Sequence, residues 1–256
     1  MTYNVHSCRG TDRRHDPARI AEVIAESAPD VIALQELDVG RSRSGRIDQA
    51  REIAMHLRVE AHFHPALHVE DEKYGDAILT ALPSRLVKAA PLPSVGEPRG
   101  AVWVEVEHEG EKIQIINTHL GLRPRERVAQ AVELLSANWL GHRDCVAGPA
   151  ILVGDFNAVP RSPAYRLLSQ HLIAPARLGG RKIPATYPSR LPLLRIDHVF
   201  TNEWVTVEDI AVNRSPLARR ASDHLPLQVS VRFRGPAQSI PGTRDAAATP
   251  SFLEFQ

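Results

Sequence analysis

The stretch ILVGDFNAVP, residues 151–160, constrains the fold of this chain more than any other. Its apolar residues run directly into Gly154, Asp155 and Asn157, and Pro160 cannot continue the hydrogen bonding of a strand. A short apolar run that ends in turn residues is typical of a buried β-strand. Strand residues two apart point to the same side, so Asp155 and Asn157 should project together. A carboxylate there is costly unless a metal, a hydrogen bond or a reaction requires it.

Asp and Asn are also ordinary turn formers, and this stretch alone does not separate a plain turn from a functional site. The pattern of an apolar strand followed by polar side chains recurs at five other places. The polar strand ends are Asn4, Glu36, His119, Asp155 with Asn157, Asp197, and Asp223 with His224. Singly, Asn4 and Asp197 also fit buried structural polar groups, and Glu36 also fits a salt-bridge partner. The recurrence favours a shared site.

The chemistry of this set points to a hard divalent cation. It contains four carboxylates, two carboxamides and two imidazoles. Oxygen-rich sets of this kind suit Mg²⁺ or Mn²⁺, which keep several waters of their own. The chain has no Cys/His cluster with zinc spacing and no glycine-rich nucleotide-binding motif, so it offers no support for a nucleotide cofactor.

Helices and strands are interleaved, but several neighbouring strands are joined by short turns. The apolar spacing predicts helices over residues 17–28, 47–57, 124–139 and 162–172. Strands are predicted over residues 2–6, 31–36, 62–65, 74–82, 101–108, 112–120, 151–155, 195–200, 205–212 and 225–233. A tight hairpin at Glu109-Gly110 joins two of them. This mixture favours an α/β fold of the α+β type, with mixed sheets covered by helices.

The chain is predicted to form one domain over residues 1–234, followed by a disordered tail over 235–256 that is rich in Gly, Pro, Ala, Ser and Thr. Met1 stands almost on the first strand, which suggests that an N-terminal extension is missing or very short. No run approaches the ~18 apolar residues of a membrane span, and no secretory signal is visible. Two cysteines make no disulfide framework, which favours a cytoplasmic protein. We expect a monomer.

Seven short motifs carry a resemblance to a known family. They are TYNVH, ALQE, YGDAILT, INTHL, GDFN, IDHVF and SDHLPL, in this order, over residues 2 to about 231. Together they resemble the endonuclease/exonuclease/phosphatase superfamily, which has the deoxyribonuclease I-like fold. The resemblance implies a four-layered α/β sandwich, in which two mixed β-sheets pack face to face with helices outside. It also implies hydrolysis of phosphate esters with a divalent metal.

The same resemblance implies a metal site. Glu36 would be the principal ligand, with Asn4 beside it and Asp223 near the metal through a water molecule. Tyr74 and Arg99 lie where members of the superfamily build the substrate-binding rim of the pocket.

Catalytic roles follow from the resemblance as well. Asp155 would orient and deprotonate the attacking water, while Asn157 and His119 would contact the phosphate oxygens. Asp197 would hydrogen-bond His224 and hold its tautomer and charge. A carboxylate behind a histidine raises the basicity of the ring, so His224 should be the more basic of the two imidazoles.

The sequence departs from some relatives in two places. The strand that ends Asn117-Thr118-His119 resembles sphingomyelinases, inositol-phosphate phosphatases, deadenylases and deoxyribonuclease I. It lacks the tyrosine-bearing motif of apurinic endonucleases, which argues against abasic-site repair. Asp76 stands where many relatives have Asn, and its charge would repel a phosphate unless it binds metal or faces away.

The leading function is therefore an Mg²⁺- or Mn²⁺-dependent phosphodiesterase acting on a small-molecule or lipid-type phosphate ester. The alternatives are a metal-dependent nuclease and an inactive binding module on the same fold. The formal net charge is only +1, and multiple phosphate contacts require clustered cations, which favours the first class. Arginine-rich loops at 9–19, 40–46 and 177–195 keep nucleic acid open as a partner. The inactive module is disfavoured because every motif position is retained.

Overall fold

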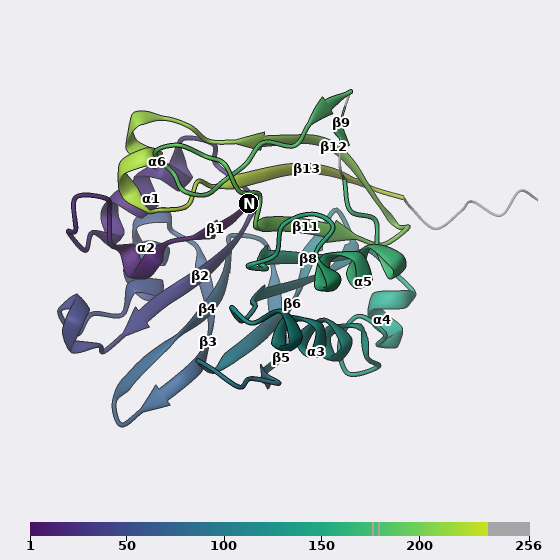
Figure 1. Cartoon of the computed structure of the whole chain (residues 1–256), viewed down its shortest axis with the longest axis horizontal. Coiled ribbons are helices and arrows are strands. Elements are labelled where there is room, and N and C mark those ends of the chain that lie inside the picture. Colours follow the sequence, from purple (N-terminus) through teal and green to yellow (C-terminus); the bar gives the residue numbers. More distant parts are fainter. Residues whose placement is uncertain (176, 179, 235–256) are drawn as a thin grey trace, which may run out of the picture.

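In the computed structural model of the chain, which describes residues 1–175, 177–178 and 180–234, two β-sheets face each other and helices cover their outer sides (Figure 1). This is the four-layered sandwich with two mixed sheets that the sequence predicts. The predicted tail, residues 235–256, lies outside the described residues. Within the described part of the chain, no helix has the length and apolar character needed to cross a membrane.

The first sheet has six strands, and its only parallel pair among the described strands is β1 with β2. In spatial order the strands are β12 (Val205–Val212), β13 (Leu227–Phe233), β1 (Thr2–Asn4), β2 (Val31–Val39), β4 (Glu72–Thr80) and β3 (Glu60–Val69). The parallel pair places the carboxyl ends of β1 and β2 at the same edge of the sheet, and both ends carry predicted site residues.

The second sheet has five strands and also contains one parallel pair, β7 with β8. In spatial order the strands are β11 (Asp197–Thr201), β8 (Ala150–Asp155), β7 (Glu111–His119), β6 (Arg99–His108) and β5 (Ser84–Leu92). His119 pairs directly with Asp155, and Asp197 pairs with Asp155 from the other side. The register of this sheet therefore brings three predicted site residues together.

The helices form the two outer layers. They are α1 (Pro17–Ala25), α2 (Gln49–Leu57) and α6 (Pro216–Ala221) on the first sheet, and α3 (Pro124–Leu135), α4 (Arg143–Val146) and α5 (Pro163–His171) on the second. Short pieces complete the structure: the 3₁₀ helices η1 (His6–Cys8) and η2 (Ser42–Ser44), and the hairpin of β9 (Arg177–Leu178) and β10 (Arg181–Lys182). Asp16, Ser162 and Ser215 cap helices that begin with proline, a pairing that satisfies a free amide and presets the first turn.

The core is divided into three apolar layers, one under each set of helices and one between the sheets. The middle layer consists mainly of β-branched residues, among them Val102, Val104, Ile113, Ile151 and Val153. Burying each such side chain stabilises the fold by about 1.5–3 kcal/mol. A polar contact crosses this layer near one end, where Gln35 Nε2 donates to Asn117 Oδ1 at 2.7 Å.

Several elements differ from the sequence prediction. Strand β5 was not predicted, because Lys88 and Pro91 interrupt its apolar pattern and it lies at the sheet edge, where proline is tolerated. Helix α3 ends at Leu135 rather than near Trp139, because Ser136 is extended. Strand β2 continues past Glu36 to Val39, because a bulge absorbs the irregularity at that residue.

Candidate active site

The predicted site residues converge at one end of the sandwich, where a pocket of about 950 Å³ opens. Glu36, His119, Asp155, Asn157, Asp223 and His224 line it. Asn4 and Asp197, each 1% exposed, lie beneath the lining. Every polar strand end singled out in the sequence therefore lies in or under this pocket.

Glu36 enters the pocket through a distortion of its strand. The pairing of β2 with β4 shifts between Leu34 and Leu37, and Glu36 has a positive φ of 64°. A non-glycine residue in this left-handed region costs on the order of 1–3 kcal/mol, and such strain is concentrated at functional sites. The backbone amide of Glu36 donates to Asp76 Oδ1 at 3.4 Å, so Asp76 supports the bulge from below.

Two carboxylates converge on one amide group. Asn4 Nδ2 lies 3.0 Å from Glu36 Oε1 and 3.0 Å from Asp155 Oδ2. Burial raises the pKa of Asp155, although the imidazolium of His224 opposes the shift. Neighbouring carboxylates in a buried site require a compensating cation, and their oxygens suit a hard divalent ion. The residues present therefore fit Mg²⁺ or Mn²⁺ held by Glu36, with Asn4 and Asp155 beside it.

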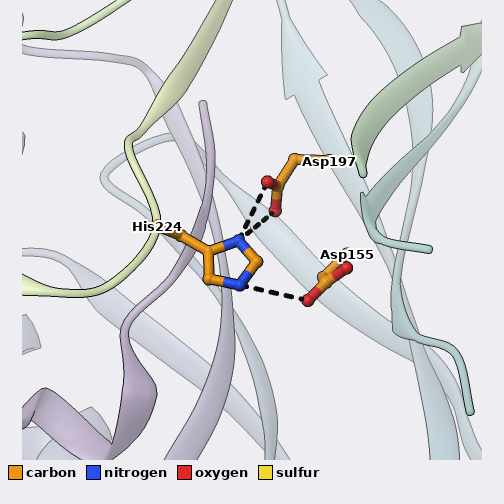
Figure 2. A group of neighbouring side chains, drawn as sticks. All are labelled: Asp155, Asp197 and His224. Carbon is orange, nitrogen blue, oxygen red and sulfur yellow. Dashed lines mark hydrogen bonds and ion pairs between the residues drawn. The ribbon is translucent and has the colours of Figure 1, made fainter. Parts of the chain in front are cut away.

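Asp155, Asp197 and His224 form a second group of potential ligands, with atoms within 4.8 Å of one another. Figure 2 shows the imidazole of His224 lying between the two carboxylates. Nδ1 of His224 is 2.9 Å from Asp197 Oδ2, and Nε2 is 3.6 Å from Asp155 Oδ2. The hydroxyl of Thr186 also donates to Asp197. Because these donors already occupy Asp197 and His224 forms an ion pair with Asp155, a cation fits better beside Glu36.

His224 carries a positive charge at neutral pH. Burial lowers its pKa, but the carboxylates of Asp197 and Asp155 raise it more strongly, to about 10. Its Nδ1–H then donates to Asp197, which leaves Nε2–H directed toward Asp155. His224 is the more basic of the two site imidazoles, as predicted.

His119 is held in the opposite state. Burial and the guanidinium of Arg99 lower the pKa of His119 well below its usual range. Arg99 Nη1 lies 2.8 Å from His119 Nδ1, and because a guanidinium only donates, Nδ1 must accept and the ring proton lies on Nε2. Asn157 Nδ2 lies 3.0 Å from that Nε2. Asn157 Nδ2 also donates to Leu120 O at 2.9 Å, and Asp155 Oδ2 lies 3.6 Å from His119 Nε2. The second N–H of Asn157 and the Nε2–H of His119 thus lie side by side, an arrangement suited to an anionic oxygen.

Comparisons with known proteins identify the family of this chain. The family model described as "Endonuclease/Exonuclease/phosphatase family" matches residues 1–224. The chain belongs to this family. Its members are metal-dependent phosphoesterases, and a buried Asp/His cluster is present here. A search of curated protein sequences finds no match.

Solved structures share the fold. An endonuclease/exonuclease/phosphatase from Beutenbergia cavernae is 23% identical, with a TM-score of 0.69 over 91% of this chain and 71% of that one. The human Nocturnin catalytic domain with bound sulfate is 22% identical, with a TM-score of 0.70 over 91% and 93%. A mannosyl-6-phosphatase from Bacteroides thetaiotaomicron is 20% identical, with a TM-score of 0.71 over 91% and 98%.

Three further predicted residues, Tyr74, Arg99 and Asp223, also line the pocket. Tyr74 and Arg99 both line the pocket, but Arg99 is 6% exposed and lies behind His119, paired with Glu97 at 2.9 Å. Asp223 stands on the pocket wall, with Oδ1 3.5 Å from His6 Nδ1. The substrate roles of Tyr74 and Arg99 and the metal role of Asp223 stay predictions.

Some pocket residues were not identified from the sequence. Thr186, which donates to Asp197, lies in a predicted loop with no motif to mark it. Tyr187 places its ring 4.8 Å from that of His224, and Arg127 also lines the pocket. Arg43, from the arginine-rich loop singled out in the sequence, lines the pocket too, and it pairs with Asp38 of β2 at 2.7 Å.

The buried carboxyl of Asp76 predicts a pH-dependent gain in stability. Burial raises its pKa from an ordinary 3.8 to about 7, so ionising it costs folding free energy as pH rises through that interval. In chelator at pH 8, Asp76→Asn should raise the melting temperature by several degrees, and at pH 4 the gain should vanish. The control is Asp71→Asn at an exposed position. A gain that does not depend on pH would contradict the burial of a charged Asp76.

The Asp197–His224 pair predicts a coupled loss of activity. Removing the carboxylate in Asp197→Asn should lower the pKa of His224, so activity that needs imidazolium should fall off at lower pH than in the wild type. His224→Ala should cost ~10²- to 10⁴-fold in turnover, and the double variant little more, because the residues act as a unit. The pH–rate profiles of phosphoester hydrolysis measure both effects. Single losses that multiply in the double variant would show that the residues work independently.

Proposed function

We propose that this chain is a divalent-metal-dependent phosphodiesterase that acts on a small-molecule or lipid-type phosphate ester. The observation that carries the proposal is the set of donors around Asp155. His119 Nε2 and His224 Nε2 each lie 3.6 Å from Asp155 Oδ2, and Asn157 Nδ2 lies 3.0 Å from His119 Nε2. A carboxylate surrounded by fixed donors is what in-line hydrolysis of a phosphoester requires.

Each side chain then has a defined task. Asp155 orients a water molecule and takes its proton, and the backbone amide of Asn157, 2.8 Å from Asp155 Oδ1, fixes the carboxylate. His224 carries a positive charge, while His119 and Asn157 supply neutral donors, and together they stabilise the negative charge that develops on the phosphoryl oxygens. A bound divalent cation supplies further stabilisation of that charge.

Asp197 and Arg99 are positioning residues in this proposal. Asp197 directs Nε2–H of His224 into the pocket by accepting from Nδ1. Arg99 directs Nε2–H of His119 into the pocket by donating to Nδ1. The two histidines therefore face the substrate in different charge states, one set by a carboxylate and the other by a guanidinium.

A nuclease is the second candidate, because Arg9, Arg13, Arg43 and Arg127 line the pocket. Arg43 is paired with Asp38, and Arg127 donates to the carbonyl of Leu122 at 2.6 Å, so both are already engaged. The formal net charge of +1 also gives little general attraction to a polyanion.

We propose in addition that the protein is cytoplasmic, which Cys8 and Cys145, both buried and unpaired, support.

A substrate panel tests this proposal. Purified protein should hydrolyse bis-p-nitrophenyl phosphate with Mg²⁺ or Mn²⁺, lose the activity in EDTA, and recover it when metal is added back. His119→Ala should lower turnover by ~10²- to 10⁴-fold. The matched control is His171→Ala, which alters an exposed histidine at the end of α5.

Two results would reject the proposal. Full turnover in chelator would contradict metal dependence. Degradation of plasmid DNA or RNA at low enzyme concentration, with every small ester left intact, would assign the site to a nuclease. A steep fall in substrate affinity with salt would support that second outcome, since it marks many phosphate contacts.

A further inference from the structure

Exposed apolar side chains lie at the mouth of the pocket. We call this set, Leu122, Val159, Leu191, Leu193 and Leu194, the apolar rim. Leu122, Val159 and Leu194 line the pocket, with 71%, 43% and 44% of their surface exposed. Leu191 and Leu193 are 66% and 70% exposed and belong to the same turn as Leu194. In the described part of the chain, four of the five strongly exposed leucines belong to this rim, so they are not scattered at random.

The turn that presents these leucines is firmly anchored. Leu194 N donates to Tyr187 O at 2.8 Å, and the ring of Tyr187 packs 4.8 Å from that of His224. Arg219 Nη1 donates to Arg190 O at 2.9 Å, and Arg190 Nη2 donates to Thr11 O at 3.3 Å. The exposure of Leu191 and Leu193 is therefore a fixed feature of the pocket mouth.

Cationic side chains lie beside the apolar rim. Arg9 and Arg13 line the pocket, are exposed, and have no side-chain hydrogen bond or ion pair within the described residues. Arg123 directly follows Leu122, and Arg190 directly precedes Leu191; both are exposed. The mouth of the pocket therefore combines positive charge, of which Arg9 and Arg13 carry the part without a side-chain partner, with exposed aliphatic surface.

We propose that the pocket mouth docks on an anionic phospholipid surface and that the substrate is the phosphodiester headgroup of a phospholipid in that surface. The inference rests on the proposed phosphodiesterase function. Because the apolar rim borders the pocket, a surface that docks on it brings its own phosphates to the site. A bilayer places phosphates at its surface and acyl chains directly beneath, which matches arginines beside leucines. Nucleic acid would engage the arginines and leave the leucines in water, and a small soluble ester would engage neither.

The magnitudes are sufficient for reversible docking. A fully inserted leucine side chain contributes about 1.5–3 kcal/mol, and each arginine near an anionic surface about 1 kcal/mol. Several such contacts together can hold a protein at the surface of a bilayer without a membrane-spanning segment. The attraction should weaken in high salt, because its electrostatic part is screened.

Vesicle sedimentation with the full chain tests the docking surface. Phosphatidylcholine vesicles containing phosphatidylglycerol should sediment the protein, and pure phosphatidylcholine or high salt should reduce binding. Leu191→Ser/Leu193→Ser should weaken the partition coefficient by at least about tenfold. The control, Val132→Ser/Val146→Ser, changes residues that are 56% and 60% exposed and do not line the pocket, and it should bind like the wild type.

Activity assays separate this inference from the proposed function. Leu191 and Leu193 do not line the pocket, so their double variant should keep hydrolysis of bis-p-nitrophenyl phosphate while headgroup release from vesicles falls with binding. Vesicle binding by a protein that hydrolyses no ester would uphold the docking surface and reject the phosphodiesterase.

Three results would overturn the docking surface itself. The first is the absence of leucine-dependent binding, shown either by a wild type that does not bind anionic vesicles or by a double leucine variant that binds them equally well. The second is a dimer in solution that the leucine variant dissociates, which would make the rim an interface between copies. The third is tight, leucine-independent binding of single-stranded RNA or DNA that vesicles do not compete away.

Discussion

The hydrogen bond between Gln35 and Asn117 joins the two sheets next to the site, and the relative position of the site residues depends on it. Asn117 also donates to the carbonyl oxygens of Leu34 and Ala77, at 2.8 and 2.9 Å, so one buried amide connects three strands. Glu36 follows Gln35, and His119 lies two residues beyond Asn117. Fixing this contact therefore fixes the separation between the carboxylate of one sheet and the imidazole of the other. An unmade hydrogen bond here would cost about 1–3 kcal/mol per buried group, which makes the register difficult to change.

Electrostatic preorganisation follows from that register. The site contains two imidazoles and several carboxylates, and each imidazole is held in one protonation state by its surroundings. Asp197 holds His224 as an imidazolium, and Arg99 holds His119 neutral, with its proton on Nε2. Asp76 is buried outside the pocket lining, where its carboxylate accepts from the backbone amide of Glu36.

Much of this arrangement was predictable from the sequence, because it depends on short local patterns. Each polar strand end is a run of apolar residues followed by a carboxylate, an amide or an imidazole. The order of the seven motifs along the chain indicates the fold. The bulge at Glu36, the contact of Arg99 with His119 and the hydroxyl of Thr186 were not predictable. Each depends on side chains far apart in sequence or on a backbone distortion without a glycine to mark it. Strand β5 was missed for a different reason: an edge strand tolerates Pro91 and Lys88, which disguise its alternation.

The central claim is that Glu36 holds a divalent cation where the two sheets meet, with Asn4 and Asp155 beside it. Titration calorimetry with Mn²⁺ on the wild type and on Glu36→Gln tests it without relying on any substrate, and Glu22→Gln on the exposed face of α1 is the matched control. The account predicts that the wild type and Glu22→Gln bind Mn²⁺ alike, while Glu36→Gln loses at least about tenfold in affinity, since a charged ligand is removed. Equal binding by Glu36→Gln would contradict it.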